Sequence, residues 1–310
     1  MKKILITGSS GFLGTRLAFD FKGKAASKRG QISSLNLPSG SRLGEAKYEL
    51  LLPSHSELNV SREDAVKAYL EEHQPDAVLH CAALSNTWYC EQHPEESHRV
   101  NVQGTVKLAK ACKQIGAKLI FMSSDQVYNG TPLLGLLKEE DVLQPVNIYG
   151  CHKLEAEQRA LWNNPDAVGL RLTWMYDLPD SDLKLNTNIL VNLQKAYNEG
   201  STVKAATHEY RGVTNVWDVV RNMEKVLSLP GGIYNYGSGN KLNSYDLHLH
   251  AAALMELKNP TEWILADEER FADQARNLTM DCSQIEKYGI HFPDSVEGIR
   301  EAINRPSRTA

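Results

Sequence analysis

The chain has 310 residues, of which 42% are hydrophobic and 23% charged, and its formal net charge at pH 7 is -4. This length and composition predict a soluble globular protein with a substantial core. The slight negative charge argues against a general nucleic-acid surface, and no apolar run approaches the ~20 residues that a membrane helix needs. The five cysteines lack CxxC spacing, which predicts neither a disulfide framework nor a metal site and favours a reducing, cytoplasmic location.

Strands and helices alternate along the first half of the chain. KKILIT (2–7) is an apolar run bounded by glycine, typical of a buried parallel strand, and residues 11–21 have helical spacing. Residues 61–73 open with a serine and an acidic turn, which predicts a helix capped by Ser61. Further strands are expected over 75–83, 118–124 and 167–176, and further helices over 101–116, ended by Gly116, and 149–163. This alternation predicts an α/β, Rossmann-type, doubly wound parallel sheet with right-handed crossovers.

After about residue 177 the rhythm of strands and helices loosens, and no linker marks a boundary. We expect a cofactor-binding domain over 1–177 and a smaller substrate-binding lobe over 178–310, packed over the strand ends. The chain is expected to return to the sheet within about 205–237, near GIYNYGSG.

A glycine-rich turn follows the first predicted strand, where Gly8, Gly11 and Gly14 form TGSSGFLG. Glycine allows a tight turn, a close backbone approach to a pyrophosphate and close helix packing, and the helix N-terminus offers unpaired N–H groups. A glycine trio alone also fits a plain loop, but its place between the first strand and the first helix favours cofactor binding.

The stretch YGCHK places Tyr149 and Lys153 four residues apart, on one face of a predicted helix. It follows SSDQVY, which stands at the carboxyl end of a strand, where open α/β sheets bind ligands. Cys151 and His152 point away from the shared face and are interpreted as scaffolding, although a reactive thiol remains an alternative. His248 and His250 are likewise interpreted as structural.

TGSSGFLG, FMSSDQVYNG, YGCHK and RLTWMY together resemble the extended short-chain dehydrogenase/reductase family. The similarity is greatest to its dTDP-4-dehydrorhamnose reductase branch and to the related regulatory subunit of methionine adenosyltransferase. It covers most of the chain and is specific through residue 177. The resemblance implies an NAD(P)-dependent oxidoreductase acting on a nucleotide sugar, and it allows a homodimer.

The resemblance also implies roles for individual residues. Ser124 would hydrogen-bond the substrate oxygen, with Ser123 as the alternative. Tyr149 would exchange a proton with that oxygen, and Lys153 would lower the tyrosine pKa and hold the nicotinamide ribose. The implied substrate contacts are Ser85, Ser124, Asp125, Gln126 and Trp174. The implied cofactor contacts are Gly8, Gly11, Phe12, Leu13, Gly14, Arg16, Asn59, Val60, Cys81, Ala82, Ala83, Asn101, Tyr149 and Lys153.

The acidic residue that the family uses for the adenosine ribose is not found. Its position falls near Asn36 if the second strand is QISSLN, or near Ser54 if that strand is YELLLP. The segment from Lys22 to Lys47 is basic, so NADP(H) is favoured over NAD(H), with a solvated surface insertion as the alternative. Arg16 is a second candidate for a 2′-phosphate, and Asn59 stands where the family often has an aspartate near adenine.

Two features of the sequence help to decide which reaction the protein catalyses. Gln126 stands where the family's sugar dehydratases carry a glutamate, and an amide cannot transfer the proton that dehydration needs. Toward the C-terminus, DQARNLTMD (273–281) matches the branch's pattern at Asn277 and Asp281 but lacks its Arg-Pro and its serine. A reductase of a nucleotide-linked 4-keto-6-deoxy sugar is therefore expected. An epimerase with bound NAD and a non-catalytic cofactor-binding subunit are the alternatives.

Overall fold

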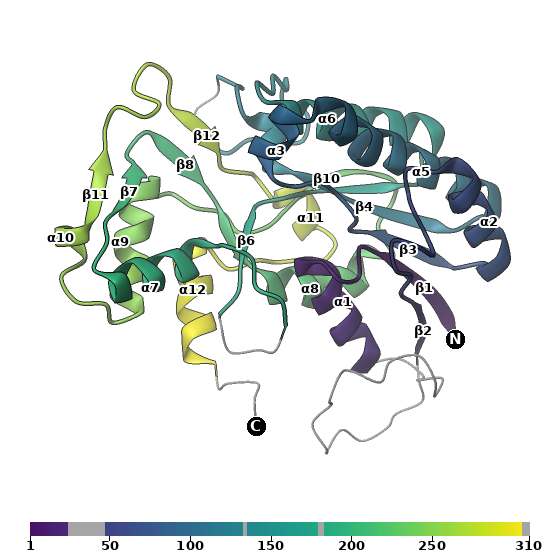
Figure 1. Cartoon of the computed structure of the whole chain (residues 1–310), viewed down its shortest axis with the longest axis horizontal. Coiled ribbons are helices and arrows are strands. Elements are labelled where there is room, and N and C mark those ends of the chain that lie inside the picture. Colours follow the sequence, from purple (N-terminus) through teal and green to yellow (C-terminus); the bar gives the residue numbers. More distant parts are fainter. Residues whose placement is uncertain (24–46, 133–134, 179–182, 306–310) are drawn as a thin grey trace.

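A six-stranded parallel sheet forms the centre of the computed structural model, which describes residues 1–23, 47–132, 135–178 and 183–305 (Figure 1). The strand order is β10-β5-β4-β3-β1-β2, and every neighbouring pair is parallel. The strands are β1 (Lys2–Thr7), β2 (Tyr48–Leu51), β3 (Ala77–His80), β4 (Lys118–Ser124), β5 (Val168–Leu172) and β10 (Gly232–Tyr236). The predicted α/β class and parallel sheet are confirmed.

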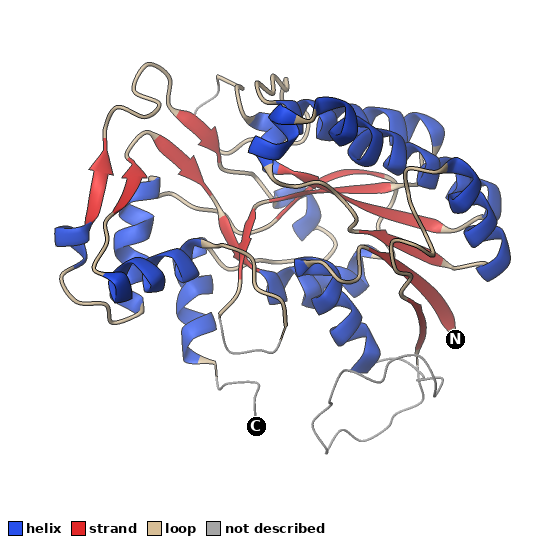
Figure 2. Ribbon diagram, in the orientation of Figure 1, coloured by secondary structure: helices blue, strands red, loops and turns tan. Residues whose placement is uncertain are grey.

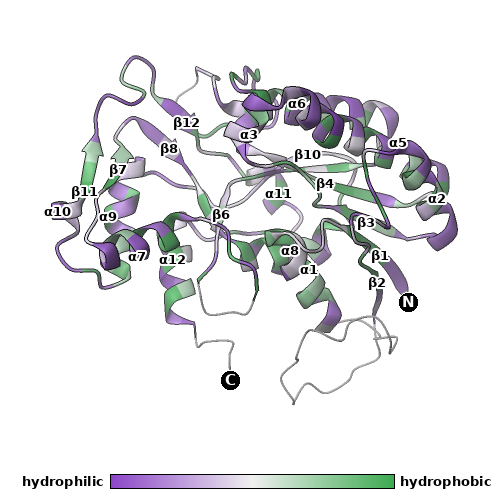
Figure 3. Cartoon of the chain, in the orientation of Figure 1, coloured by the Kyte–Doolittle hydropathy of each residue, from purple (hydrophilic) through white to green (hydrophobic). Residues whose placement is uncertain are grey.

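Helices cover both faces of this sheet (Figure 2). On one face α1 (Phe12–Gly23) packs beside α8 (Val216–Val226), and the other layer holds α2 (Glu63–His73), α5 (Thr105–Ile115) and α6 (Ile148–Asn163). The short helices of this half are α3 (Thr87–Gln92), α4 (Pro94–Ser97), the π-helical η1 (His98–Gly104), the 3-10 turn η2 (Asp125–Tyr128) and α11 (Ser283–Glu286). Since both faces are covered, the central strands are mostly apolar, whereas α2, α5 and α6 are polar outside (Figure 3).

A smaller lobe, made of the remaining elements, lies beside the sheet (Figure 1). Three parallel strand pairs build it: β6 (Trp174–Tyr176) with β9 (Val213–Asn215), β7 (Val203–Ala206) with β11 (Ile264–Asp267), and β8 (Glu209–Arg211) with β12 (Arg276–Leu278). Its helices are α7 (Ile189–Glu199), α9 (Ser244–Leu254), α10 (Pro260–Trp263) and α12 (Ser295–Asn304). This lobe has its own apolar core, while β10 returns from it to pair with β5. The exact division at residue 177 stays a prediction.

Two predicted elements differ in detail from the structure. The helix expected over 61–73 begins at Glu63, and Ser61 does not cap it, because its hydroxyl donates to Asn59 Oδ1 (2.7 Å) in the preceding turn. The strand expected over 167–176 breaks at Thr173, whose hydroxyl hydrogen-bonds that of Thr214 (2.5 Å), so β6 leaves the central sheet and pairs with β9. Within the described ranges, no helix is long and apolar enough to cross a membrane.

Candidate functional site

A cavity of about 1130 Å³ lies at the carboxyl ends of the central strands, with walls from both lobes. Open α/β sheets bind ligands at this edge, where the strand order reverses on either side of β1. Many of the residues predicted to form the site line this cavity: Gly11, Phe12, Leu13, Cys81, Ala83, Ser85, Ser124, Asp125, Gln126, Tyr149, Lys153 and Trp174.

The glycine turn joins β1 to α1 and forms one wall of the cavity. Gly8 has a left-handed φ of 67°, and a Cβ there would lie 2.6 Å from the backbone nitrogen of Ala82. A Cβ on Gly14 would collide with the Gly8 carbonyl oxygen, and Gly11 N donates to that same oxygen (2.9 Å). Bare backbone and the free N–H groups of the α1 N-terminus therefore face the cavity, a surface that fits a pyrophosphate.

The three residues predicted to be catalytic lie together in the cavity wall. Ser124 ends β4, and Tyr149 and Lys153 are both buried in the first two turns of α6, which Asn147 caps by accepting from Gly150 N (2.7 Å). Ser124 lies close enough to Tyr149 to lower the tyrosine pKa, and Lys153 Nζ lies 5.6 Å from the centre of the tyrosine ring. Lys153 also donates to the Met122 carbonyl (2.7 Å). This geometry suits proton transfer at an oxygen bound between Ser124 and Tyr149.

Burial dominates the ionisation of the two α6 residues. It raises the pKa of Tyr149, and the nearby Ser124 opposes that rise. It lowers the pKa of Lys153 from 10.5 to about 8, while Cys90, Glu157 and Cys81 act weakly in the opposite direction. The lowering of the Tyr149 pKa by Lys153, which the resemblance implied, is not found, and the Tyr149 hydroxyl stays neutral and can donate a proton.

Cys151 and His152 of YGCHK lie outside the cavity. Cys151 is exposed, and its thiol donates to the Pro145 carbonyl (3.3 Å). His152 Nδ1 hydrogen-bonds Ser97 Oγ (2.9 Å), and its ring packs edge-on against His98. Both residues therefore contact the packing partners of α6, which agrees with the interpretation of them as scaffolding.

A buried ion pair supports the catalytic strand and helix from behind. Arg171 of β5 donates to both carboxylate oxygens of Glu157 on α6, at 3.0 and 2.8 Å. Ser123 donates to the same carboxylate (2.5 Å), and Tyr128 accepts from Arg171 (2.6 Å). Ser123, the alternative to Ser124, is thus engaged in the core.

Four of the expected cofactor residues have local structural contacts. Asn101 accepts from Leu84 N and donates to Leu84 O, both at 2.9 Å, so it shapes the loop after β3. Asn59 accepts from Ser61 in the turn before α2. Val60 is buried against the position of Gly104, and the Ala82 backbone packs against Gly8. Their contacts with a cofactor stay predictions.

Arg16 does not face the cavity as a free cation. Its side chain is 0% exposed, pairs with Asp177 at 2.6 Å and donates to the carbonyls of Phe12 (2.8 Å) and Lys184 (3.1 Å). Binding of a 2′-phosphate by Arg16 would require this ion pair to open. Arg16 instead joins the first helix to the chain that follows β6.

The position expected to bind the adenosine ribose depends on which segment forms the second strand. That strand is Tyr48–Leu51, so the position falls near Ser54, and Asn36 lies outside the described residues. A carboxylate does lie there, contrary to expectation, because Glu57 accepts from both Ser54 N and Ser54 Oγ (2.7 Å each). Sequence spacing missed it because the turn after β2 folds Glu57 back. Most of the basic segment, residues 24–46, lies outside the described part of the chain.

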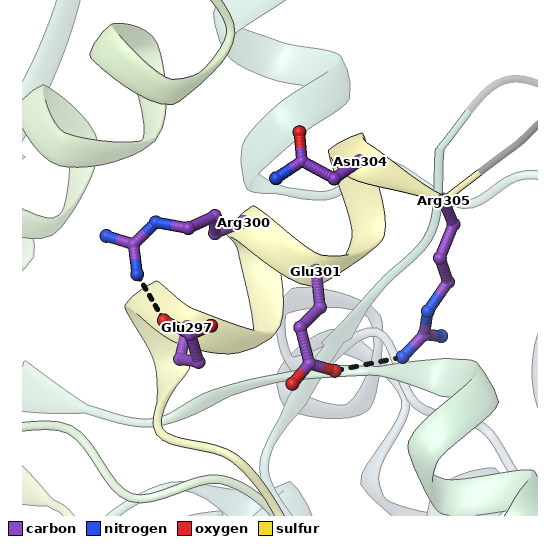
Figure 4. Close-up of a pocket in the computed structure, with 5 residues that line it drawn as sticks. All are labelled: Glu297, Arg300, Glu301, Asn304 and Arg305. Atoms are coloured by element: carbon purple, nitrogen blue, oxygen red, sulfur yellow. Dashed lines mark hydrogen bonds and ion pairs between the residues drawn. The ribbon is translucent and has the colours of Figure 1, made fainter.

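A second, shallower hollow of about 320 Å³ lies along α12 (Figure 4). Its side chains mostly pair with one another: Arg300 with Glu297, and Arg305 with Glu301 (3.1 Å). None of the predicted site residues lines it. Among the described residues, no group of three or more histidine, cysteine or acidic side chains is placed to hold a metal ion.

Comparison with known proteins agrees with this geometry. The model of the RmlD substrate binding domain matches residues 1–307. The chain belongs to this family. Methionine adenosyltransferase 2 subunit beta of Xenopus laevis is 29% identical over 311 residues, covering 97% of this chain and 87% of the relative. dTDP-4-dehydrorhamnose reductase of Mycolicibacterium smegmatis is 33% identical over 175 residues, 56% of this chain and 46% of the relative.

Solved structures share the RmlD-type fold over the whole chain. A dTDP-4-dehydrorhamnose reductase from Clostridium acetobutylicum superposes with a TM-score of 0.80 at 21% identity, covering 97% of this chain and 98% of that one. The reductase from Bacillus anthracis, in complex with NADP, gives 0.78 at 20% identity with the same coverage. The resemblance read from the sequence motifs is confirmed at the level of family and fold.

The RmlD-type cavity also contains residues that the sequence motifs did not indicate. The smaller lobe contributes Glu209, Arg211, Arg270, Arg276 and His248 to its wall. His248 lines the cavity while its Nδ1 bonds the Ser244 carbonyl (2.6 Å), so its interpretation as structural stays a prediction. No short motif marks these residues, and pairing between β8 and β12 brings Glu209 and Arg211 beside Arg276.

Proposed function

We propose that this protein is an NADP-dependent reductase of a nucleotide-linked 4-keto-6-deoxy sugar. The observation that carries the proposal is the burial of Ser124, Tyr149 and Lys153 in one cavity that also holds the glycine turn. Nicotinamide cofactors supply a hydride for carbonyl reduction. Tyr149 gives its proton to the carbonyl oxygen, Ser124 donates a hydrogen bond to the same oxygen, and Lys153 holds the ribose beside them.

NADP(H) is the proposed cofactor, and NAD(H) is the alternative. The basic segment 22–47 supplies cations for a 2′-phosphate, and the similar Bacillus anthracis reductase was solved with NADP. Glu57 beside Ser54 favours NAD instead, because a carboxylate repels a 2′-phosphate and accepts from a 2′-hydroxyl. The basic segment carries the greater charge, and we therefore retain NADP(H).

The substrate assignment depends on the residues around the catalytic trio. Gln126 cannot donate or accept the proton that sugar dehydration needs, which leaves reduction as the simpler chemistry. Trp174 lines the cavity, and the Arg211 guanidinium lies 5.3 Å from its ring centre. One face of Trp174 is therefore shared with an arginine, and the sugar packs on the remaining ring surface.

A screen of nucleotide sugars for NADPH oxidation tests this function directly. We expect turnover with a 4-keto-6-deoxyhexose on a nucleoside diphosphate. Trp174→Ala should lower kcat/KM by a factor equivalent to ~1–3 kcal/mol of lost packing, with unchanged NADPH affinity. Absence of turnover with every keto-sugar nucleotide would reject the reductase.

A non-catalytic cofactor-binding subunit is the second candidate. It is favoured by the similarity to methionine adenosyltransferase 2 subunit beta over 97% of this chain. Tight NADPH binding without turnover, together with co-purification of a partner enzyme, would support it. Tightly bound NAD that survives dialysis would instead indicate an epimerase. The homodimer and the cytoplasmic location stay predictions.

A further inference from the structure

Two arginines of the smaller lobe contact the two residues that follow Ser124. Arg211 of β8 pairs with Asp125 (Nη2 to Oδ2, 2.7 Å), and Arg276 of β12 donates weakly to Gln126 Oε1 (3.5 Å). Because β8 and β12 pair in parallel, the two guanidinium groups approach the η2 turn from one side. The smaller lobe thus reaches the catalytic strand end through charged side chains.

Asp125 connects Arg211 to Ser124. Its side chain is only 2% exposed, and its two oxygens have different partners. Oδ2 binds Arg211, whereas Oδ1 accepts from Ser124 Oγ (3.2 Å) and from Gln126 Nε2 (3.3 Å). A serine hydroxyl has one proton, so Ser124 can donate to a substrate oxygen only by releasing Asp125.

We propose that Arg211 is a positioning residue that acts on Ser124 through Asp125. The proposal rests on the function above, in which Ser124 and Tyr149 both act on one carbonyl oxygen. The guanidinium fixes the position of the carboxylate and offsets its charge. Without it, the nearly buried carboxylate binds the Ser124 proton more strongly and adds uncompensated negative charge beside Tyr149.

The electrostatics of Tyr149 agree with this role. Burial is the largest cause of the raised pKa of Tyr149, and the charges of Asp125 and Cys90 raise that pKa further. Arg211 is less exposed than a surface cation, at 18%, so solvent screens its pair with Asp125 only in part. Arg211 therefore offsets the negative charge of Asp125, which would otherwise weaken Ser124 and Tyr149 as hydrogen-bond donors to the substrate.

Four variants test the proposal: Arg211→Gln, Arg211→Lys, Asp125→Asn and the double variant Asp125→Asn/Arg211→Gln. We expect R211Q to lower kcat by about tenfold, and R211K, which keeps the charge, to lose less. The double variant should have a kcat at least about threefold higher than R211Q, because it no longer carries the uncompensated Asp125 carboxylate. If the ion pair had a merely structural role, R211Q would lower NADPH affinity and stability together with kcat, and the double variant would restore all three.

The matched control is Arg62→Gln, which removes an arginine from an exposed pair with Asp64 on the surface. It should leave kcat and NADPH affinity unchanged. NADPH affinity should also stay within about twofold of wild type in R211Q, which separates positioning from loss of folding. A double variant as slow as R211Q, or an R211Q variant as fast as wild type, would overturn the proposal.

Two carbonyl substrates separate this inference from the proposed function. The first is the nucleotide-linked keto sugar, and the second is an activated aromatic diketone, which needs the proton donors but no sugar site. If wild type reduces only the diketone, the sugar assignment fails, and the Arg211 series is decided on the diketone. If wild type reduces neither compound, the reductase function and the role of Arg211 both fail.

Discussion

Replacing Lys153 with methionine should stabilise the cofactor-free protein at neutral pH while it removes turnover. The ammonium group is buried, and burial lowers its pKa from 10.5 to about 8. Between pH 8 and 10.5 the folded state has lost this proton while the unfolded state still binds it, so the stability of wild type rises with pH there. At about 1.4 kcal/mol per pH unit, the charged lysine costs about 3 kcal/mol at pH 7.

Part of that gain is lost with the hydrogen bond from Lys153 Nζ to the Met122 carbonyl, worth about 1 kcal/mol. Methionine keeps the apolar stem in the same space, so the net expected gain is about 2 kcal/mol at pH 7. Urea unfolding of both proteins at pH 7 and at pH 10 measures it. The difference should shrink or reverse at the higher pH.

Lys110→Met, at an exposed position on α5, is the control for loss of a lysine and should show no such pH dependence. If K153M is less stable than wild type at pH 7, by a margin that does not change up to pH 10, then burial does not strain this lysine. Such a result would show that the buried Lys153 does not lower the stability of the fold in exchange for catalysis.

Three further outcomes are expected. Tyr149→Phe should abolish turnover and leave NADPH affinity within about twofold of wild type, because only the proton donor is lost. Cys151→Ala should change kcat by less than about twofold. An equal loss of kcat in both variants would show that the Cys151 thiol takes part in the reaction. NADPH should bind more tightly than NADH in fluorescence titrations, and a tenfold preference for NADH, about 1.4 kcal/mol, would reject the role given to the basic segment. Arg171→Met should lower the free energy of unfolding by about 3–5 kcal/mol in denaturant titrations, because Glu157 is left buried without its ion-pair partner. Adding Glu157→Leu should restore part of that free energy, and additive losses in the double variant would contradict the prediction.

The fold was predictable because its signals are local. Buried parallel strands appear as apolar runs, and the glycine turn and the Tyr149/Lys153 spacing each lie within a few residues. The break at Thr173 was not predictable, since a strand looks continuous in sequence until tertiary pairing with β9 draws its end away. Glu57 was missed for the same reason, because a turn brings it back to Ser54.

Half of the candidate site depends on contacts between distant segments. Arg211 and Asp125 are 86 positions apart, and only the docking of β8 on the strand end joins them. A lone arginine in HEYRGVTN has no pattern to mark it, whereas Ser124, Tyr149 and Lys153 stand in recognisable surroundings. Sequence therefore indicates the reacting groups of such a site more readily than the groups that adjust them.

The altered segment 273–281 shows how this affects specificity. Asn277, which matches the reductase pattern, donates to the Gly135 carbonyl (2.6 Å), and Asp281 N donates to Leu137 O (2.8 Å), so both matching residues fasten β12 to the chain after β4. Arg276, which falls at the position that the pattern leaves unspecified, lines the cavity instead. The matching positions thus preserve the place of the strand, and a position that the pattern leaves open determines what the strand presents to a ligand. Specificity in this protein is accordingly to be sought at Arg276 and its neighbours on β8, rather than at the residues by which the family is recognised.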